Sequence, residues 1–211
     1  MQNVFRNFVI LCSLLVVPQI AFADTSAVTF AGYLGSNNLD ANIGWSFQVN
    51  KALTVTGLGY YDVGFDGLAG DHTVGIFDLG TNSLLTWNVV VGGTVAPIMD
   101  GFRYVAVAPL VLNPGVYFVM ANNPATDAFV ALATNFVSDP RITFGTGVYT
   151  AGGASLLPPD TAEFQFNPSF FGPNLLIAPD RAANVPEPAS LFLLGTGLLA
   201  IAGTRKLRKN R

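Results

Sequence analysis

The polar residues best placed to do chemistry lie between residues 62 and 72. Asp62, Asp66 and Asp71 fall within the glycine-rich stretch YDVGFDGLAGD, and carboxylate oxygens on a flexible backbone suit Ca²⁺. Their spacing matches no EF-hand loop, and aspartate is also common in turns because it hydrogen-bonds its own backbone. The segment can therefore be a calcium loop or a set of solvated turns, and the sequence favours the turns.

The residue types that usually carry catalysis are scarce. His72 is the only histidine, so any imidazole-based proton transfer would have to use it. No G-x-S-x-G is present, and Glu163 is the one glutamate before the C-terminal segment, whereas glycosidases commonly use a pair of carboxylates. The single cysteine, Cys12, lies in the N-terminal segment. We expect no catalytic residue, no metal ligand and no cofactor, and hence a protein that is not an enzyme.

The aromatic residues give a weaker indication of sugar binding, which favours exposed Trp or Tyr rings. Trp87 alternates with Leu85 and Val89, which predicts a core position. Trp45 and the Tyr60-Tyr61 pair are left as candidate surface rings.

Residues 1–23 are typical of a secretory signal peptide. Arg6 supplies the positive charge, residues 8–17 form an apolar run, and Ala21-Phe22-Ala23 is a small-x-small cleavage site. The apolar run is too short to span a bilayer, which needs roughly 20 helical residues. We expect the mature chain to begin at Asp24, with a retained anchor as the alternative.

Residues 24–178 are expected to form one all-β domain, an antiparallel sandwich or jelly roll. Apolar residues alternate with a period of two over residues 54–56, 85–91, 116–120 and 142–144, and residues 175–177 are the expected last strand. Turn signals at residues 64–67, 92–93, 113–115, 122–124, 152–153 and 158–160 divide the chain into about eight to ten strands. Helical periodicity is nowhere sustained.

Two local patterns refine this expectation. In residues 53–60 the apolar residues change phase at Gly57, which predicts a bulge there or a barrel corner. Pro114-Gly115 predicts a tight turn between two strands.

The charge of this body excludes one class of partner. Residues 24–185 contain four Lys and Arg against twelve Asp and Glu, a net charge of −8. Such a surface repels phosphate backbones, so we expect no nucleic-acid partner.

The C-terminus has three parts after a short linker at residues 179–185. Pro186, Glu187 and Pro188 interrupt helical structure, and residues 189–203 carry no charge. Fifteen helical residues span about 22 Å, marginal for a core of roughly 30 Å. The basic tail would keep its end cytoplasmic and the acidic domain outside; it consists of Arg205, Lys206, Arg208, Lys209 and Arg211.

The order of these parts, from Val185-Pro-Glu-Pro-Ala-Ser190 to the basic end, resembles the PEP-CTERM sorting signal of Gram-negative bacteria. The resemblance covers residues 186–211 as motif, transmembrane segment and tail. It implies recognition by exosortase, cleavage near the motif, and export to the cell surface or the extracellular matrix, in systems associated with exopolysaccharide and biofilm. A permanent single-span anchor is the alternative fate of the tail.

Three interior segments, residues 53–62, 66–78 and 112–117, resemble an uncharacterised β-sandwich domain that often precedes this signal. That resemblance implies a fold and no catalytic residue. The expected function is a structural or adhesive component of the surface or matrix, anchored at least transiently in the membrane. The alternative is a carbohydrate-binding module for exopolysaccharide, with or without calcium.

Overall fold

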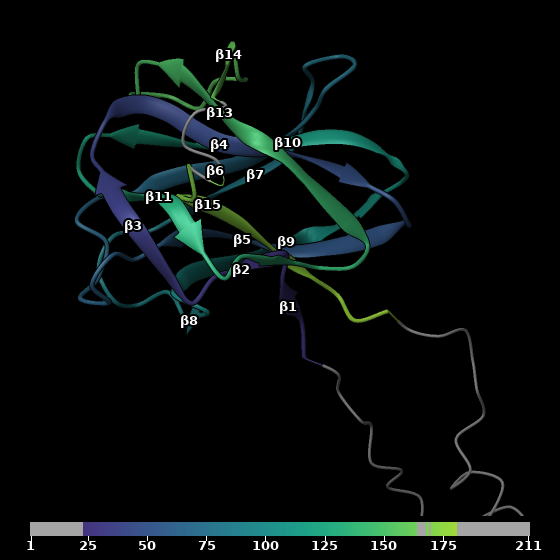
Figure 1. The fold of residues 1–211 in the computed structure, drawn as a ribbon, viewed down its shortest axis with the longest axis horizontal. Coiled ribbons are helices and arrows are strands. Elements are labelled where there is room, and N and C mark those ends of the chain that lie inside the picture. The colour runs from purple at the N-terminus through teal and green to yellow at the C-terminus, as the bar shows by residue number, and fades with distance from the viewer. Residues whose placement is uncertain (1–22, 164–167, 169, 181–211) are drawn as a thin grey trace, which may run out of the picture. The chain divides into compact units, whose positions relative to one another are not determined.

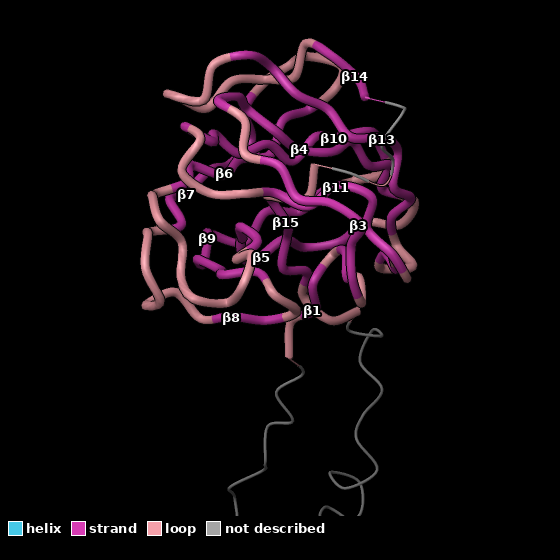
Figure 2. The backbone as a smooth tube through the Cα atoms, turned by 60° about the vertical axis from the view of Figure 1, so that its left-hand side comes forward, coloured by secondary structure: helices cyan, strands magenta, loops and turns pink. Residues whose placement is uncertain are grey.

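A computed structural model describes residues 23–163, 168 and 170–180. This part of the chain folds into fifteen β-strands, ten of them with five or more residues, and contains no helix (Figures 1 and 2). None of the described residues therefore forms a helix with the length and apolarity needed to cross a membrane. The expected signal peptide, apart from Ala23, and the expected C-terminal motif, apolar segment and basic tail lie outside the described residues.

Eleven of the fifteen strands form two antiparallel sheets, which confirms the all-β sandwich predicted from the period-two pattern. The six-stranded sheet has the order β14 (Thr161–Glu163), β13 (Ile142–Ala151), β4 (Asp40–Val49), β10 (Gly115–Pro124), β6 (His72–Asp78), β7 (Leu84–Val90). The five-stranded sheet has the order β1 (Thr25–Ser26), β15 (Pro173–Ile177), β5 (Leu53–Tyr61), β9 (Phe102–Leu112), β8 (Ile98–Met99). Two further pairs are β11 (Phe129–Thr134) with β3 (Gly32–Asn37) and β12 (Val137–Ser138) with β2 (Val28–Thr29).

The core lies between the two sheets because alternate side chains of each central strand point inward. On β4 these are Ile43, Trp45, Phe47 and Val49, all with no exposed surface. On β5 the inward phase changes as predicted, since the pairing of β5 with β9 shifts register between Val55 and Gly57. The extra residue of this bulge lets apolar side chains on both sides of Gly57 face the same core.

The connection at Pro114 is a tight turn, but the strands that it joins do not pair with each other. β9 pairs with β5 in one sheet, whereas β10 pairs with β4 and β6 in the other. The turn therefore carries the chain across the sandwich. A second turn signal was wrong: Asn122, Asn123 and Pro124 continue β10 in register with β4.

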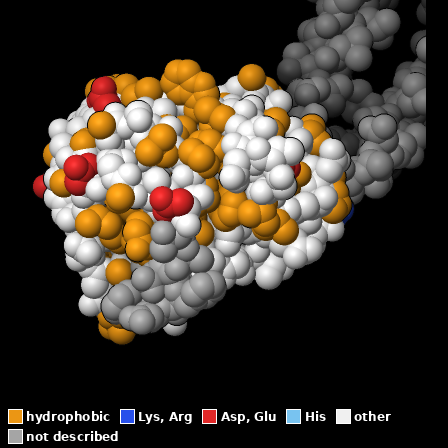
Figure 3. Space-filling view, turned by 90° about the horizontal axis from the view of Figure 1, so that it is seen from above, with side chains coloured by type: hydrophobic (Ala, Val, Ile, Leu, Met, Phe, Trp, Pro, Cys, Tyr) orange, Lys and Arg blue, Asp and Glu red, His pale blue; other side chains and the backbone are white. Residues whose placement is uncertain are grey.

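The outer face of the six-stranded sheet is also apolar. Phe77, Phe118, Met120 and Val148 form a separate buried cluster, which Leu156 covers from the loop after β13. In Figure 3, which views the molecule from above β13 and β14, hydrophobic side chains spread across this face.

Trp87 also lies on this outer face, and its predicted core position is wrong. It pairs with Gly75 on β6, and 55% of its surface is exposed. The physical reason is that β7 turns Asn88 inward, where its side-chain amide donates to the Ala106 carbonyl of β9 at 2.9 Å. Alternation identifies the residues that share a face, but it does not say which face the other sheet covers.

Candidate functional site

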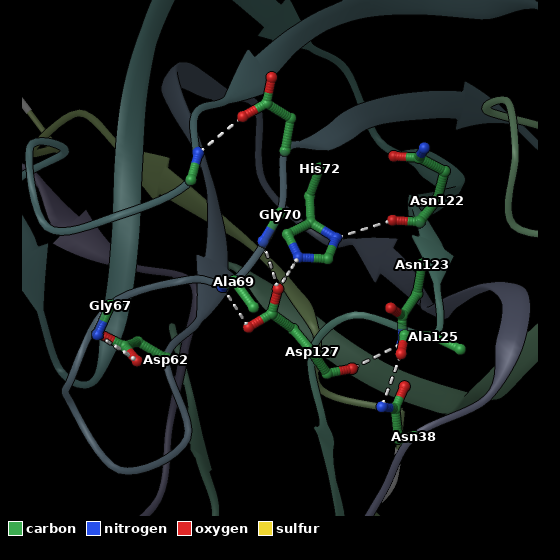
Figure 4. Close-up of polar contacts among 12 residues, drawn as sticks. Asn38, Asp62, Gly67, Ala69, Gly70, His72, Asn122, Asn123, Ala125 and Asp127 are labelled. Carbon is green, nitrogen blue, oxygen red and sulfur yellow. Dashed lines mark hydrogen bonds and ion pairs between the residues drawn. The ribbon is translucent and has the colours of Figure 1, made fainter.

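His72, the one imidazole of the chain, begins β6 and is completely buried. Its Nδ1 lies 2.9 Å from the Asn122 carbonyl oxygen and its Nε2 lies 2.9 Å from a carboxylate oxygen of Asp127 (Figure 4). The ring stacks on Tyr60 with a centroid distance of 3.6 Å and an interplanar angle of 5°. Because a backbone carbonyl can only accept, Nδ1 carries a hydrogen. One further proton, on Nε2 or on Asp127, completes the second contact.

Asp127 links this histidine to the loop before β6. Its carboxylate accepts hydrogen bonds from the backbone amides of Ala69 at 2.8 Å and Gly70 at 3.0 Å. Burial would raise the pKa of Asp127, but the hydrogen bonds from His72 and the two amides outweigh that effect and lower it.

This arrangement occupies both ring nitrogens of His72 and positions the loop before β6. A histidine that activates a nucleophile hydrogen-bonds a hydroxyl or thiol. In the described part of the chain, the hydrogen-bond partners of His72 are Asn122 and Asp127.

A second buried polar cluster joins β5 to β9. The Nε and Nη2 atoms of Arg103 each lie 2.7 Å from one oxygen of Asp62. Nη1 of Arg103 donates to the carbonyls of Thr94 and Ala96 at 3.1 and 3.0 Å. Since Asp62 also accepts the amide of Gly67, one ion pair fixes both the loop after β5 and the segment before β8.

The structure does not bring the three candidate calcium ligands together. Asp62 is neutralised by Arg103, and Asp71 accepts the amide of Gly92 at 2.8 Å. Within the described residues there is no group of three His, Cys, Asp or Glu side chains that could hold a metal ion. The loop between Asp62 and Asp71 therefore has the geometry of hydrogen-bonded turns.

Two of the three candidate surface aromatics are core residues. Trp45 and Tyr60 have no exposed surface, and the indole N–H of Trp45 donates to the Pro173 carbonyl at 2.9 Å. Burial, with a smaller contribution from the Asp127 charge, raises the pKa of Tyr60 well above its usual value. These two candidates are excluded as surface rings because β4 and β5 both lie centrally in their sheets.

Tyr61 is 6% exposed, but it lines a surface pocket of about 380 Å³. Four segments contribute to the pocket: the connection from β2 to β3, the end of β5, the loop after it, and the turn before β9. The lining residues are Thr29, Phe30, Ala31, Gly32, Tyr33, Tyr61, Gly64, Phe65, Asp100 and Gly101. Ligand pockets span roughly 300–1,000 Å³, so this pocket is large enough for a small ligand.

Two exposed aromatic rings flank Tyr61 in this pocket. The Tyr33 ring lies 6.2 Å from the Tyr61 ring at 89°, and the Phe65 ring lies 6.3 Å from it at 65°. Tyr33 is 36% exposed and Phe65 is 60% exposed. Sequence reasoning missed both residues, although an aromatic ring inside the Gly64–Gly67 turn signal was a usable indication for Phe65.

Comparison with known proteins assigns the C-terminus and leaves the β domain unassigned. Residues 184–209 match the PEP-CTERM protein-sorting motif, which confirms the resemblance drawn from Pro186, Glu187 and Pro188. No curated protein matches the chain. The motif is the signal for exosortase-dependent sorting of an exported protein.

Proposed function

We propose that this exported β-sandwich is a non-enzymatic structural or adhesive component of the cell surface or the extracellular matrix. The observation that carries the proposal is the sorting motif at residues 184–209. The motif's apolar segment would hold the chain in the membrane until exosortase cleaves near Pro186. The domain of residues 24–178 would then be released to its final location.

The contacts inside the domain support a non-enzymatic role. The ionisable groups His72, Asp127 and Asp62, the last together with Arg103, all hold loops in place through hydrogen bonds and ion pairs. Buried polar groups that are satisfied in this way fix a single conformation of the surrounding loops.

The test of this proposal follows the protein in cells that produce it. Intact mass and cell fractionation are measured for the wild-type chain and for a variant with Pro186, Glu187 and Pro188 all changed to Ala. Arg181→Ala is the matched control, because it changes the linker and leaves the motif intact. We expect the wild type and the control to lose the residues after the motif and to reach the surface or matrix, and the motif variant to stay full length in the membrane fraction. Full-length wild-type protein in the cytosol would contradict the proposal.

A second candidate function is a carbohydrate-binding module for exopolysaccharide. The pocket at Tyr61 favours it, because exposed aromatic rings beside a few polar groups are the usual composition of a small-molecule site. This candidate is compatible with the first, since a matrix protein can be retained by the polymer that it binds.

A further inference from the structure

The pocket at Tyr61 combines exposed aromatic rings with polar groups that the fold does not use. The carboxylate of Asp100, the hydroxyl of Thr29 and the hydroxyls of Tyr33 and Tyr61 have no hydrogen-bond partner among the described residues. Most other aspartates, among them Asp62, Asp71 and Asp127, make a hydrogen bond or an ion pair. In the described part of the chain, Asp66 is the one other aspartate that makes neither, and it follows the pocket residue Phe65. The pocket therefore offers unused donors and acceptors beside apolar rings.

The backbone at the pocket mouth is held in a conformation that folding alone does not favour. Phe65 has φ of 61° and Asp100 has φ of 51°, both in the left-handed region, which is strained for a residue with a side chain. Asp tolerates this region, but it is unusual for a bulky ring. Phe65 also gains little from burial, since 60% of its surface is exposed. Non-glycine residues held in such conformations cluster at ligand sites.

The charge of the lining narrows the ligand class. Asp100 is the only charged residue in the lining, which contains no lysine or arginine. The domain as a whole carries a net charge of −8 over residues 24–185. Acidic sugars such as uronates, and sulfated or phosphorylated glycans, would be repelled at this site.

From these three features we infer that the pocket binds a ring of a neutral sugar within a polysaccharide. The apolar face of the sugar packs against the rings of Tyr33 and Phe65. Its hydroxyls exchange hydrogen bonds with the Asp100 carboxylate and with the tyrosine hydroxyls, which no neighbouring group occupies. The inference rests on the second candidate function and names its site and its ligand class.

The test is a binding measurement on the full-length purified protein. The probes are an array of neutral hexose, deoxyhexose and N-acetylhexosamine oligosaccharides, together with oligouronates of the same length, and every bound glycan is then titrated by calorimetry. We expect at least one neutral oligosaccharide to bind, with little dependence on salt, and the oligouronates not to bind.

Three substitutions locate the site. Phe65→Asn removes the ring and keeps a residue that tolerates the left-handed backbone, Tyr33→Ala removes the second ring, and Asp100→Asn removes the carboxylate charge. We expect each ring substitution to weaken binding tenfold or more and Asp100→Asn to weaken it severalfold, with the melting temperature unchanged. Trp87→Ala is the matched control, because Trp87 is equally exposed but lies on β7, outside the pocket lining.

Three results would overturn the inference: no neutral glycan is bound, only acidic glycans are bound, or Trp87→Ala weakens binding as much as Phe65→Asn does. Each result leaves the sorting proposal standing, since tail removal and surface location are measured separately by mass and fractionation.

Discussion

We expect the Asp127→Ala variant to be less stable than the wild type, because the loop before β6 and the end of β10 would lose contacts that hold them in place. In Asp127→Ala, three groups lose their hydrogen-bond partner: the amides of Ala69 and Gly70 and the Nε2 atom of His72. The two amides lie near the surface and can be rehydrated, so each costs about 0.5–1 kcal/mol. His72 has no exposed surface, and leaving its buried Nε2 without a partner costs about 1–3 kcal/mol.

Together these losses lower the free energy of unfolding by about 3 kcal/mol, within the range of a broken buried pair. For a domain of this size each kcal/mol shifts Tm by about 2–4 °C, so Tm should fall by about 6–12 °C. Thermal unfolding followed by circular dichroism measures this shift. Asp66→Ala is the control, because Asp66 is exposed and makes no hydrogen bond, and it should change the unfolding free energy by less than about 0.5 kcal/mol. Equal Tm values for the two variants would refute the assignment of Asp127 as the acceptor that fixes the loop.

Two further predictions concern the same contacts and the packing of the sheets. The pKa of Asp127 is lowered in the fold, so its contribution to stability should be complete above the unfolded pKa of about 3.8 and disappear as the pH falls through the folded pKa. The urea midpoints of wild type and Asp127→Ala should therefore converge in acid, and a difference that stays constant with pH would exclude this linkage. Gly44→Ala should destabilise the domain by about 1–3 kcal/mol in urea unfolding, since the new methyl group would overlap the Val119 carbonyl, whereas Gly35→Ala, with open space around it, should not.

The sequence contained enough information to predict the strands, and it predicted the bulge at Gly57 because a change of phase is a local property of the chain. The sequence did not show which face of each strand is covered by the other sheet. Trp45 and Trp87 both lie in strands, but Trp45 is at the centre of a sheet and Trp87 is near an uncovered edge, and this difference depends on the order of strands that are distant in sequence.

The site shows the same division between local and distant information. The turn around Phe65 was readable from its glycines, whereas the pocket also needs Tyr33 and Asp100, which are brought together only by the pairing of β2, β3, β5 and β9 with their neighbours. The partner of Asp62 was equally hidden, since Arg103 is 41 residues away along the chain. Local composition therefore suggested a cation site where the distant arginine supplies the positive charge.

The place of β15 within its sheet has a consequence for export. This strand comes from the last part of the domain, yet it lies between β1 and β5 and pairs with both. A chain that emerges from the translocation channel with its N-terminus first cannot close the five-stranded sheet until Pro173–Ile177 has followed. For such a chain the five-stranded sheet would be completed only when the residues just before the sorting motif at residues 184–209 have left the channel.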